Sequence, residues 1–295
     1  MLLKAKLVRL IINIYNLKYL LFSILLFFFL GQLKAQENSS VENFAFQSGE
    51  KLTFRGYYNW GFLWVAAGEV KLEVKNESYS GKPAYKIEAL GRSLKAFDWF
   101  FKLRDTISCY VDTTSLKPYY FDRNTNEGDY IARHQYWFDY EKHEIYSKIQ
   151  KRQKPVKRDT LENKHISSDI VSIAYYTRNL DFSKYKKNEK IPLRMLIDNE
   201  VHNLYIRYKG IEDVKLKSGE VYECLKFSPM LVKGHLFQGG EDMTIWVSND
   251  MNRVPIMVEA KVLIGSVKGL LQSYEGLRST RNSHFKNRSG KVDVD

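Results

Sequence analysis

From Gly49 onward the chain alternates between apolar and polar residues with a period close to two. The first such run sets Leu52, Phe54, Gly56 and Tyr58 against Lys51, Thr53 and Arg55. This alternation is typical of β-strands with one buried face, because successive side chains of a strand point to opposite faces. Similar runs continue to residue 274 and are divided by short turn sequences. About a dozen strands with short turns predict a mainly all-β protein with an antiparallel curved sheet, either a partly closed barrel or a sandwich.

Residues 167–180 interrupt this alternation with a helical pattern. Ser167, Ser168 and Asp169 are residue types that cap helix N-termini, and apolar residues recur at helical spacing after them. The other faces are also largely apolar, with Val171, Tyr175 and Tyr176. A helix with so little polar surface is expected to be buried. The sequence therefore predicts one central buried helix, with the sheet curved around it.

The N-terminal residues 1–35 have the features of a secretory signal peptide. A basic stretch precedes the apolar run 20–30, and Leu33-Lys34-Ala35 places a small residue before an expected cleavage at Gln36. The apolar run is shorter than the ~20 residues of a membrane span. We expect export to the periplasm of a Gram-negative bacterium, with an uncleaved N-terminal anchor or secretion as alternatives. No stable transmembrane span is expected in the mature chain.

The remainder is expected to form a single β-rich domain over residues 36–278, followed by a disordered polar tail over residues 279–295. Without residues 1–35, the formal net charge falls from +12 to about +7. A mildly basic exported chain without a recognition motif is not expected to bind nucleic acid. The two cysteines, Cys109 and Cys224, lie in separate alternating runs. The spacing favours two buried free thiols and leaves a disulfide open.

Common catalytic signatures are absent from the sequence, including G-x-S-x-G, H-E-x-x-H, the P-loop and C-x-x-C. We therefore predict no catalytic residues, no cofactor and no metal. His134 and His143 could face each other across a hairpin and, with Glu144, ligate a metal. Surface histidines beside a turn are the favoured interpretation.

Aromatic residues supply the candidate ligand site. If the segment around Trp60 meets the segment around Trp99, the two could line an apolar pocket. Core packing is the alternative, since aromatic residues are common in strands. Arg178, near the end of the expected helix, could pair with an acidic head group. The candidate ligand-binding residues are Trp60, Trp64, Trp99, Phe100, Tyr175 and Arg178.

A second candidate site is the basic stretch 148–158, which contains no acidic residue. It could contact phosphate-bearing lipid or another anionic surface. The alternative is a solvated hairpin whose charges prevent edge-to-edge aggregation. The candidate contact residues are Lys151, Arg152, Lys154, Lys157 and Arg158.

Several pieces of the chain together resemble a family of exported bacterial proteins, the domain of unknown function 3108. They are Phe46-x-x-Gly49-Glu50-x-Leu52-x-Phe54, Ala67-Gly68-Glu69-Val70, the helical segment Asp169 to Arg178, Ile245 to Pro255, and Gly265-Ser266-Val267. The resemblance covers about residues 44–274. It implies a periplasmic β-rich domain and no assigned activity.

Three functions are compatible with these features. The leading hypothesis is a non-enzymatic cell-envelope protein whose curved sheet binds a lipid or another apolar ligand. The alternative is a structural or assembly factor that binds another envelope protein through a sheet edge or the basic stretch. An envelope-glycan hydrolase is the least favoured, with Glu69, Asp105 and Glu241 as its candidate acids.

Overall fold

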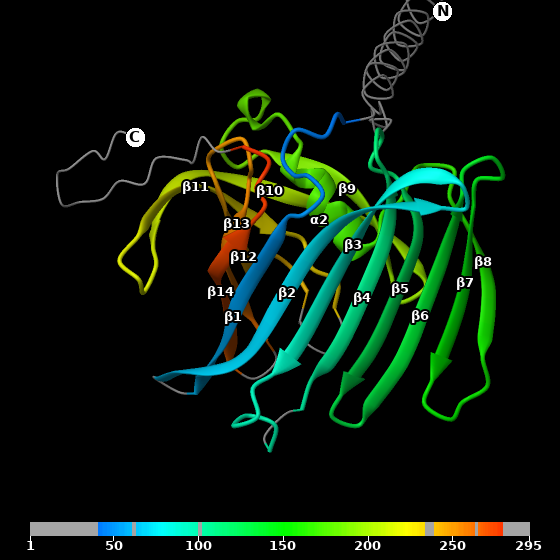
Figure 1. Ribbon diagram of the computed structural model, residues 1–295, viewed down its shortest axis with the longest axis horizontal. Coiled ribbons are helices and arrows are strands. Elements are labelled where there is room, and N and C mark those ends of the chain that lie inside the picture. Colours follow the sequence, from blue (N-terminus) through cyan, green and yellow to red (C-terminus); the bar gives the residue numbers. More distant parts are fainter. Residues whose placement is uncertain (1–40, 61–62, 100–101, 234–238, 263–264, 280–295) are drawn as a thin grey trace, which may run out of the picture. The chain divides into compact units, whose positions relative to one another are not determined.

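The computed structural model describes residues 41–60, 63–99, 102–233, 239–262 and 265–279 (Figure 1). They belong to one compact unit within Ser40–Asp295. The expected signal segment 1–35, Phe100, the Trp60 side chain and nearly all of the expected tail lie outside the described residues. Within the described ranges, no helix is long and apolar enough to cross a membrane.

The described residues form fourteen strands in a single antiparallel sheet. The strands are β1 (Lys51–Trp60), β2 (Leu63–Tyr79), β3 (Lys82–Ser93), β4 (Arg104–Asp112), β5 (Pro118–Glu127), β6 (Tyr130–Asp139), β7 (Glu144–Lys151), β8 (Lys157–Glu162), β9 (Lys190–Ile197), β10 (Glu200–Lys215), β11 (Val221–Pro229), β12 (Met243–Ser248), β13 (Pro255–Lys261) and β14 (Ser266–Glu275). The mainly β prediction is confirmed.

The sheet joins two meanders, one of strands β1–β8 and one of strands β9–β14. Neighbours in sequence pair throughout each meander, and the pairing of β1 with β14 connects them. The chain crosses between the two sheet edges, β8 and β9, through helix α2 (Ile170–Arg178) and the short 3-10 helix η1 (Phe182–Lys184). The edges do not pair with each other, so the sheet is open rather than a closed barrel.

The sheet is strongly curved around α2. The helix packs against β3 and β4 and also against β9, which is nine strand positions from β4 in the sheet order. At about 4.8 Å per strand, a flat sheet would separate them by roughly 43 Å, whereas a nine-residue helix is only about 14 Å long. Figure 1 shows α2 between the front strands β2–β4 and the rear strand β9. The expected curvature around a central helix is confirmed.

Helix α2 is shorter than the expected 167–180 because the chain before it is committed to the sheet. Ser168 forms a parallel bridge with Met195 in β9, and its amide donates to the Arg194 carbonyl at 3.1 Å. The helix therefore begins only after Asp169. One strip, at Ile170 and Ala174, is exposed, whereas Val171, Ile173 and Tyr175 are buried, as expected of a central helix.

Three groups of buried side chains form the core. One joins β2–β7, β9 and the N-terminal segment to Val171 and Tyr175 of α2, and one joins η1 and β9–β12 to Ile173. The third lies among β1 and β10–β14. Cys109 and Cys224 belong to different groups, and both are buried free thiols, as the sequence favoured.

Candidate functional site

Arg178 and Glu50 form a buried ion pair that fastens α2 to the entrance of β1. Both terminal nitrogens of the guanidinium group, Nη1 and Nη2, donate to the carboxylate oxygens at 2.7 Å. The same side chain also donates to the carbonyls of Ala45 and Asn252. Both side chains are almost fully buried. Arg178 is thus held by partners from two separate segments of the chain, residues 45–50 and the β12–β13 turn.

Aromatic rings complete this anchor. The Arg178 guanidinium lies 5.6 Å from the centre of the Phe46 ring and 4.9 Å from that of Tyr175. The next residue, Asn179, accepts hydrogen bonds from the amides of Phe44 and Ala45 at 2.8 and 2.9 Å. The C-terminus of α2 therefore holds the N-terminal segment in place. In this arrangement Arg178 and Tyr175 stabilise the fold.

The other predicted ligand residues lie elsewhere. Trp64 lies in β2 and pairs with Asn59 of β1, and the ammonium of Lys268 lies 4.6 Å from the centre of the Trp64 ring. Trp99 is exposed in the connection between β3 and β4. Among the described side chains, the predicted set is therefore divided among three places. The two aromatic segments do meet, but through Tyr58 and Phe97, whose ring centres are 6.2 Å apart.

The strand register identifies an apolar wall on the face of the sheet that carries α2, here called the inner face. In β1, Phe54, Gly56 and Tyr58 share this face with the core residue Leu52. Cross-strand partners share a face. The partners in β14 are Leu271, Gly269 and Val267, and those in β2 are Val70, Gly68 and Val65.

This apolar wall is open to solvent below the level of the helix. Val65, Val70 and Val267 are exposed although they lie on the core side of the sheet. The row of glycines between them removes side chains from three adjacent strands. A Cβ built on Gly269 would meet nothing within 4 Å. The helix fills one part of the concave face and leaves this part uncovered.

A polar cluster lies on the same inner face, on β4–β6. Nη2 of Arg123 lies 3.5 Å from a carboxylate oxygen of Asp105 and 3.2 Å from one of Glu127. Burial, together with the neighbouring Asp105 carboxyl, raises the pKa of Glu127 to about 7. The Glu127 carboxyl therefore keeps its proton up to near neutral pH.

Buried polar atoms surround this cluster. Arg123 pairs across the strands with His134, and Thr125 pairs with Ala132. Both ring nitrogens of His134, Oγ1 of Thr125 and Nε of Arg123 are buried and have no hydrogen-bond partner among the described residues. Burial lowers the pKa of His134, which favours the neutral imidazole. Such atoms are costly to leave unpaired and are the natural contacts of a polar ligand.

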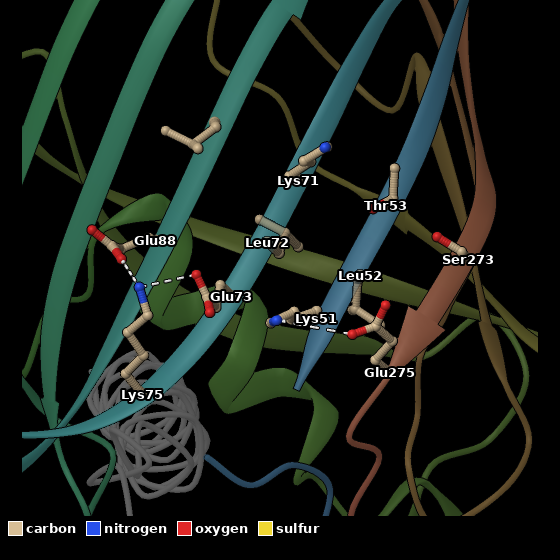
Figure 2. Close-up of a pocket in the computed structure, with 11 residues that line it drawn as sticks. Lys51, Leu52, Thr53, Lys71, Leu72, Glu73, Lys75, Glu88, Ser273 and Glu275 are labelled. Carbon is tan, nitrogen blue, oxygen red and sulfur yellow. Dashed lines mark hydrogen bonds and ion pairs between the residues drawn. The ribbon is translucent and has the colours of Figure 1, made fainter. Parts of the chain in front are cut away.

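The opposite, outer face carries a shallow groove across β3, β2, β1 and β14 (Figure 2). Its charged side chains neutralise each other. Nζ of Lys75 lies 2.9 Å from Glu73 and 2.8 Å from Glu88, and Lys51 faces Glu275 at 3.9 Å. Such a network of exposed ion pairs is an ordinary solvated sheet surface, so the groove offers little to a ligand.

Over residues 53–272 the chain matches the family model described as Protein of unknown function (DUF3108). The chain belongs to the DUF3108 family. The family expected from the sequence is thereby confirmed. No curated protein sequence gives a significant match.

One solved structure supports the fold of this DUF3108 chain. It is the crystal structure of a beta-barrel-like protein of the domain of unknown function DUF1849 from Brucella abortus, with a TM-score of 0.52 and 12% sequence identity. The match covers 78% of this chain and 99% of that chain. At this identity the similarity shows the fold alone.

The two histidines considered as metal ligands are separated in this DUF3108 protein. His134 is buried on β6 opposite Ile149, whereas His143 lies in the β6–β7 turn with a φ of 56°. The described residues contain no group of three or more side chains suited to a metal ion. The geometry therefore gives no support to a metal centre formed by His134, His143 and Glu144.

The basic stretch forms the exposed end of the β7–β8 hairpin, at one edge of the sheet. Arg152 pairs with Asp129 at 3.1 Å, and Lys157 with Asp159 at 3.7 Å. Of the remaining candidates, Lys154 and Arg158 are exposed. Basic side chains along an edge strand discourage the addition of another strand. This arrangement agrees with the solvated-hairpin interpretation of Lys151–Arg158.

Sequence reasoning missed most of the polar cluster, although it left a signal. Asp105, Arg123 and His134 are in phase with the core residues Cys109, Phe121 and Tyr136 of their strands. A polar residue at an inward position is the informative exception in an alternating strand. Only Asp105, as an acid of a hydrolase, and His134, as a possible metal ligand, were considered.

Proposed function

We propose that this protein is a non-enzymatic binding protein of the cell envelope that holds an apolar or amphipathic ligand, such as a lipid or an acyl chain, against the inner face of its sheet. The observation that carries the proposal is the open apolar wall on β14, β1 and β2. Val70 is 41% exposed although it shares a face with the buried Phe54. Apolar surface on the concave side of a sheet is where ligand sites form.

The glycine row supports the same interpretation. Gly56 pairs with both Gly68 and Gly269, so three neighbouring strands contribute no side chain at one level of the concave face. Glycine weakens a strand interior, and it often marks a place where a ligand approaches the backbone closely. An alkyl chain could lie along this row with Val65, Val70 and Val267 beside it.

The polar cluster gives little support to glycan hydrolysis. Glycosidases separate their two carboxyl groups by about 5 to 9.5 Å to admit the reacting groups. Here Nη2 of Arg123 contacts both Asp105 and Glu127, at 3.5 and 3.2 Å. The other acids considered, Glu69 and Glu241, pair with arginines at 2.8 and 2.7 Å. These contacts suit a structural or binding role.

Native mass spectrometry of the protein purified from its own envelope tests the proposal. We expect a co-purifying lipid with the wild type and its loss in Val70→Asp, which places a charge on the apolar wall. Leu90→Asp is the matched control, because Leu90 is 51% exposed on neighbouring β3 but pairs with Lys71 on the outer face. Equal lipid in both variants, or none in the wild type, would contradict the proposal.

Export to the periplasm is part of the proposal and rests on the sequence of residues 1–35. Expression of the full chain in a Gram-negative host should yield a periplasmic protein. Its intact mass should match a chain that begins at Gln36. An unprocessed chain in the membrane fraction would support the N-terminal anchor instead. A cytoplasmic protein that keeps residues 1–35 would contradict export.

A further inference from the structure

We infer that the polar cluster on β4–β6 binds the head group of the amphipathic ligand, and that this head group is uncharged and rich in hydroxyl groups, as in a sugar or a glycerol. The inference rests on the proposed function and specifies the chemistry of the ligand. The residues that carry it are Asp105, Arg123, Thr125, Glu127 and His134.

The apolar wall and the polar cluster are continuous across the inner face. Val70 in β2 pairs with Gly91 in β3, and Gly91 pairs with Asp105 in β4. Two strand spacings of about 4.8 Å therefore separate Val70 from Asp105. Gly91 itself has no side chain, and the apolar side chain of Leu103 covers it, with Cδ2 3.3 Å from where a Cβ on Gly91 would lie. An amphiphile with its chain along the glycine row would place its head group near Asp105 and Arg123.

The charges of the cluster nearly cancel. The Arg123 guanidinium, 33% exposed, contacts both carboxyl groups, and the Glu127 carboxyl keeps its proton up to near neutral pH. The charged groups that act on His134 besides Arg123 are Asp198, from the β9–β10 turn, and Lys151 in β7, which have opposite signs. A phosphate would lie against the two carboxyl groups, and an ammonium would lie against Arg123. An uncharged head group avoids both repulsions.

The unpartnered atoms require a head group with both hydrogen-bond donors and acceptors. A neutral imidazole such as that of His134 offers one N–H donor and one acceptor, the Thr125 hydroxyl can do either, and Nε of Arg123 donates. His134 and Thr125 are 4% and 1% exposed, and both lie on the inner face by register. A hydroxyl group both donates and accepts, so several adjacent hydroxyls can satisfy this mixed set. Carboxylate, phosphate and quaternary ammonium groups cannot.

Three amphiphiles with the same twelve-carbon chain test the inference: dodecyl maltoside, dodecyl phosphate and dodecyltrimethylammonium. Each is titrated as a monomer into the mature protein by calorimetry. We expect the maltoside to bind about tenfold more tightly than the other two, the equivalent of about one net hydrogen bond. Thr125→Val and His134→Leu should each remove most of that advantage and leave the affinity for the other two amphiphiles unchanged.

Thr106→Val is the matched control, because Thr106 is exposed on β4 and lies on the outer face, out of phase with Asp105. It should leave all three affinities unchanged. If the wild type binds the three amphiphiles equally, or prefers the phosphate or the ammonium, that result alone overturns the inference. Val70→Asp would still reduce binding in that case, and the proposed function would stand. If none of the three amphiphiles binds, both the inference and the proposed function are contradicted.

Discussion

Arg178 on α2 and Glu50 at the entrance of β1 are 128 residues apart in sequence and form a buried ion pair with two 2.7 Å hydrogen bonds. The pair joins the helix to the first strand, while the same guanidinium holds the carbonyl of Asn252 in the β12–β13 turn. Three distant parts of the chain depend on this one contact. Sequence reasoning gave Arg178 a possible role toward a ligand, and its position gives it a role in tertiary structure.

Breaking this ion pair should strongly destabilise the fold. Arg178→Met leaves the Glu50 carboxylate buried and uncompensated, and such changes cost about 3–5 kcal/mol. Arg207→Met is the control, because Arg207 forms a similar contact with Glu241 at 2.7 Å but with both side chains partly exposed, where a much smaller loss is expected. Urea unfolding followed by circular dichroism measures both. Equal losses in the two variants would show that burial does not govern the Arg178 contact.

The helix N-cap offers a second prediction. The carboxylate of Asp169 accepts hydrogen bonds from the amides of Val171 and Ser172 at 2.8 and 2.9 Å. Asp169→Ala should lower the free energy of unfolding by about 0.5–2 kcal/mol, whereas Asp169→Asn keeps a cap of similar quality. Thermal melting of both variants compares them. Similar melting temperatures for the alanine and asparagine variants would mean that the cap contributes little.

The raised pKa of Glu127 should make stability depend on pH. The pKa of Glu127 rises from an ordinary 4.5 to about 7 in the folded protein. The folded state therefore binds this proton more tightly than the unfolded state does. The stabilisation that this proton gives the folded state is fully present below about pH 4.5 and is lost as the pH rises to about 7. The full loss is on the order of 1–3 kcal/mol.

Glu127→Gln should remove this loss, so that the variant gains stability over the wild type at pH 8 but not at pH 4. Denaturant unfolding at several pH values between 4 and 8 measures the difference. Glu77→Gln serves as the control, because Glu77 lies in the exposed ion-pair network of β2. A wild type and a Glu127 variant with parallel pH profiles would show that the pKa of Glu127 is not raised in the folded protein.

The cysteines should behave as two protected thiols. Cys109 and Cys224 are buried in different parts of the core, and burial raises the pKa of the Cys109 thiol well above its ordinary value. A thiol reagent should therefore modify neither cysteine in the native protein. In denaturant without reductant it should titrate two thiols per chain. A value near zero in denaturant would instead reveal a disulfide.

Local sequence patterns were sufficient where the physical cause was local. The alternation of Leu52, Phe54 and Tyr58 with charged residues reflects the two faces of a strand, and it correctly indicated an antiparallel all-β fold. Asp198 and Asn199 form a tight turn between β9 and β10, with positive φ values of 48° and 71°. Aspartate and asparagine tolerate this conformation better than most residues, so the residue types themselves indicate a turn.

The candidate site was harder to predict from the sequence because it depends on which strands become neighbours. Trp60, Trp64 and Trp99 looked like one group from their sequence order, but the pleat places Trp64 on the opposite face from Tyr58 and Val65. Gly56, Gly68 and Gly269 looked unrelated, and the pairing of β1 with β14 brings them into one row. A pattern of period two tells which residues share a face of one strand. It does not tell what lies beside them.

The sequence by itself determined the strands, most of the turns, the capped helix near the middle and the family, since these follow from side-chain periodicity, backbone preferences and the order of short motifs. Tertiary structure alone decided that β1 pairs with β14, that Arg178 is committed to Glu50, and that Asp105, Arg123 and Glu127 meet on the inner face. For the first two, the physical reason is distance along the chain, because contacts between residues more than a hundred positions apart form only when the sheet has curved around α2. Asp105, Arg123 and Glu127 lie on strands that are neighbours in sequence, and there the register of β4 with β5 decides which side chains meet.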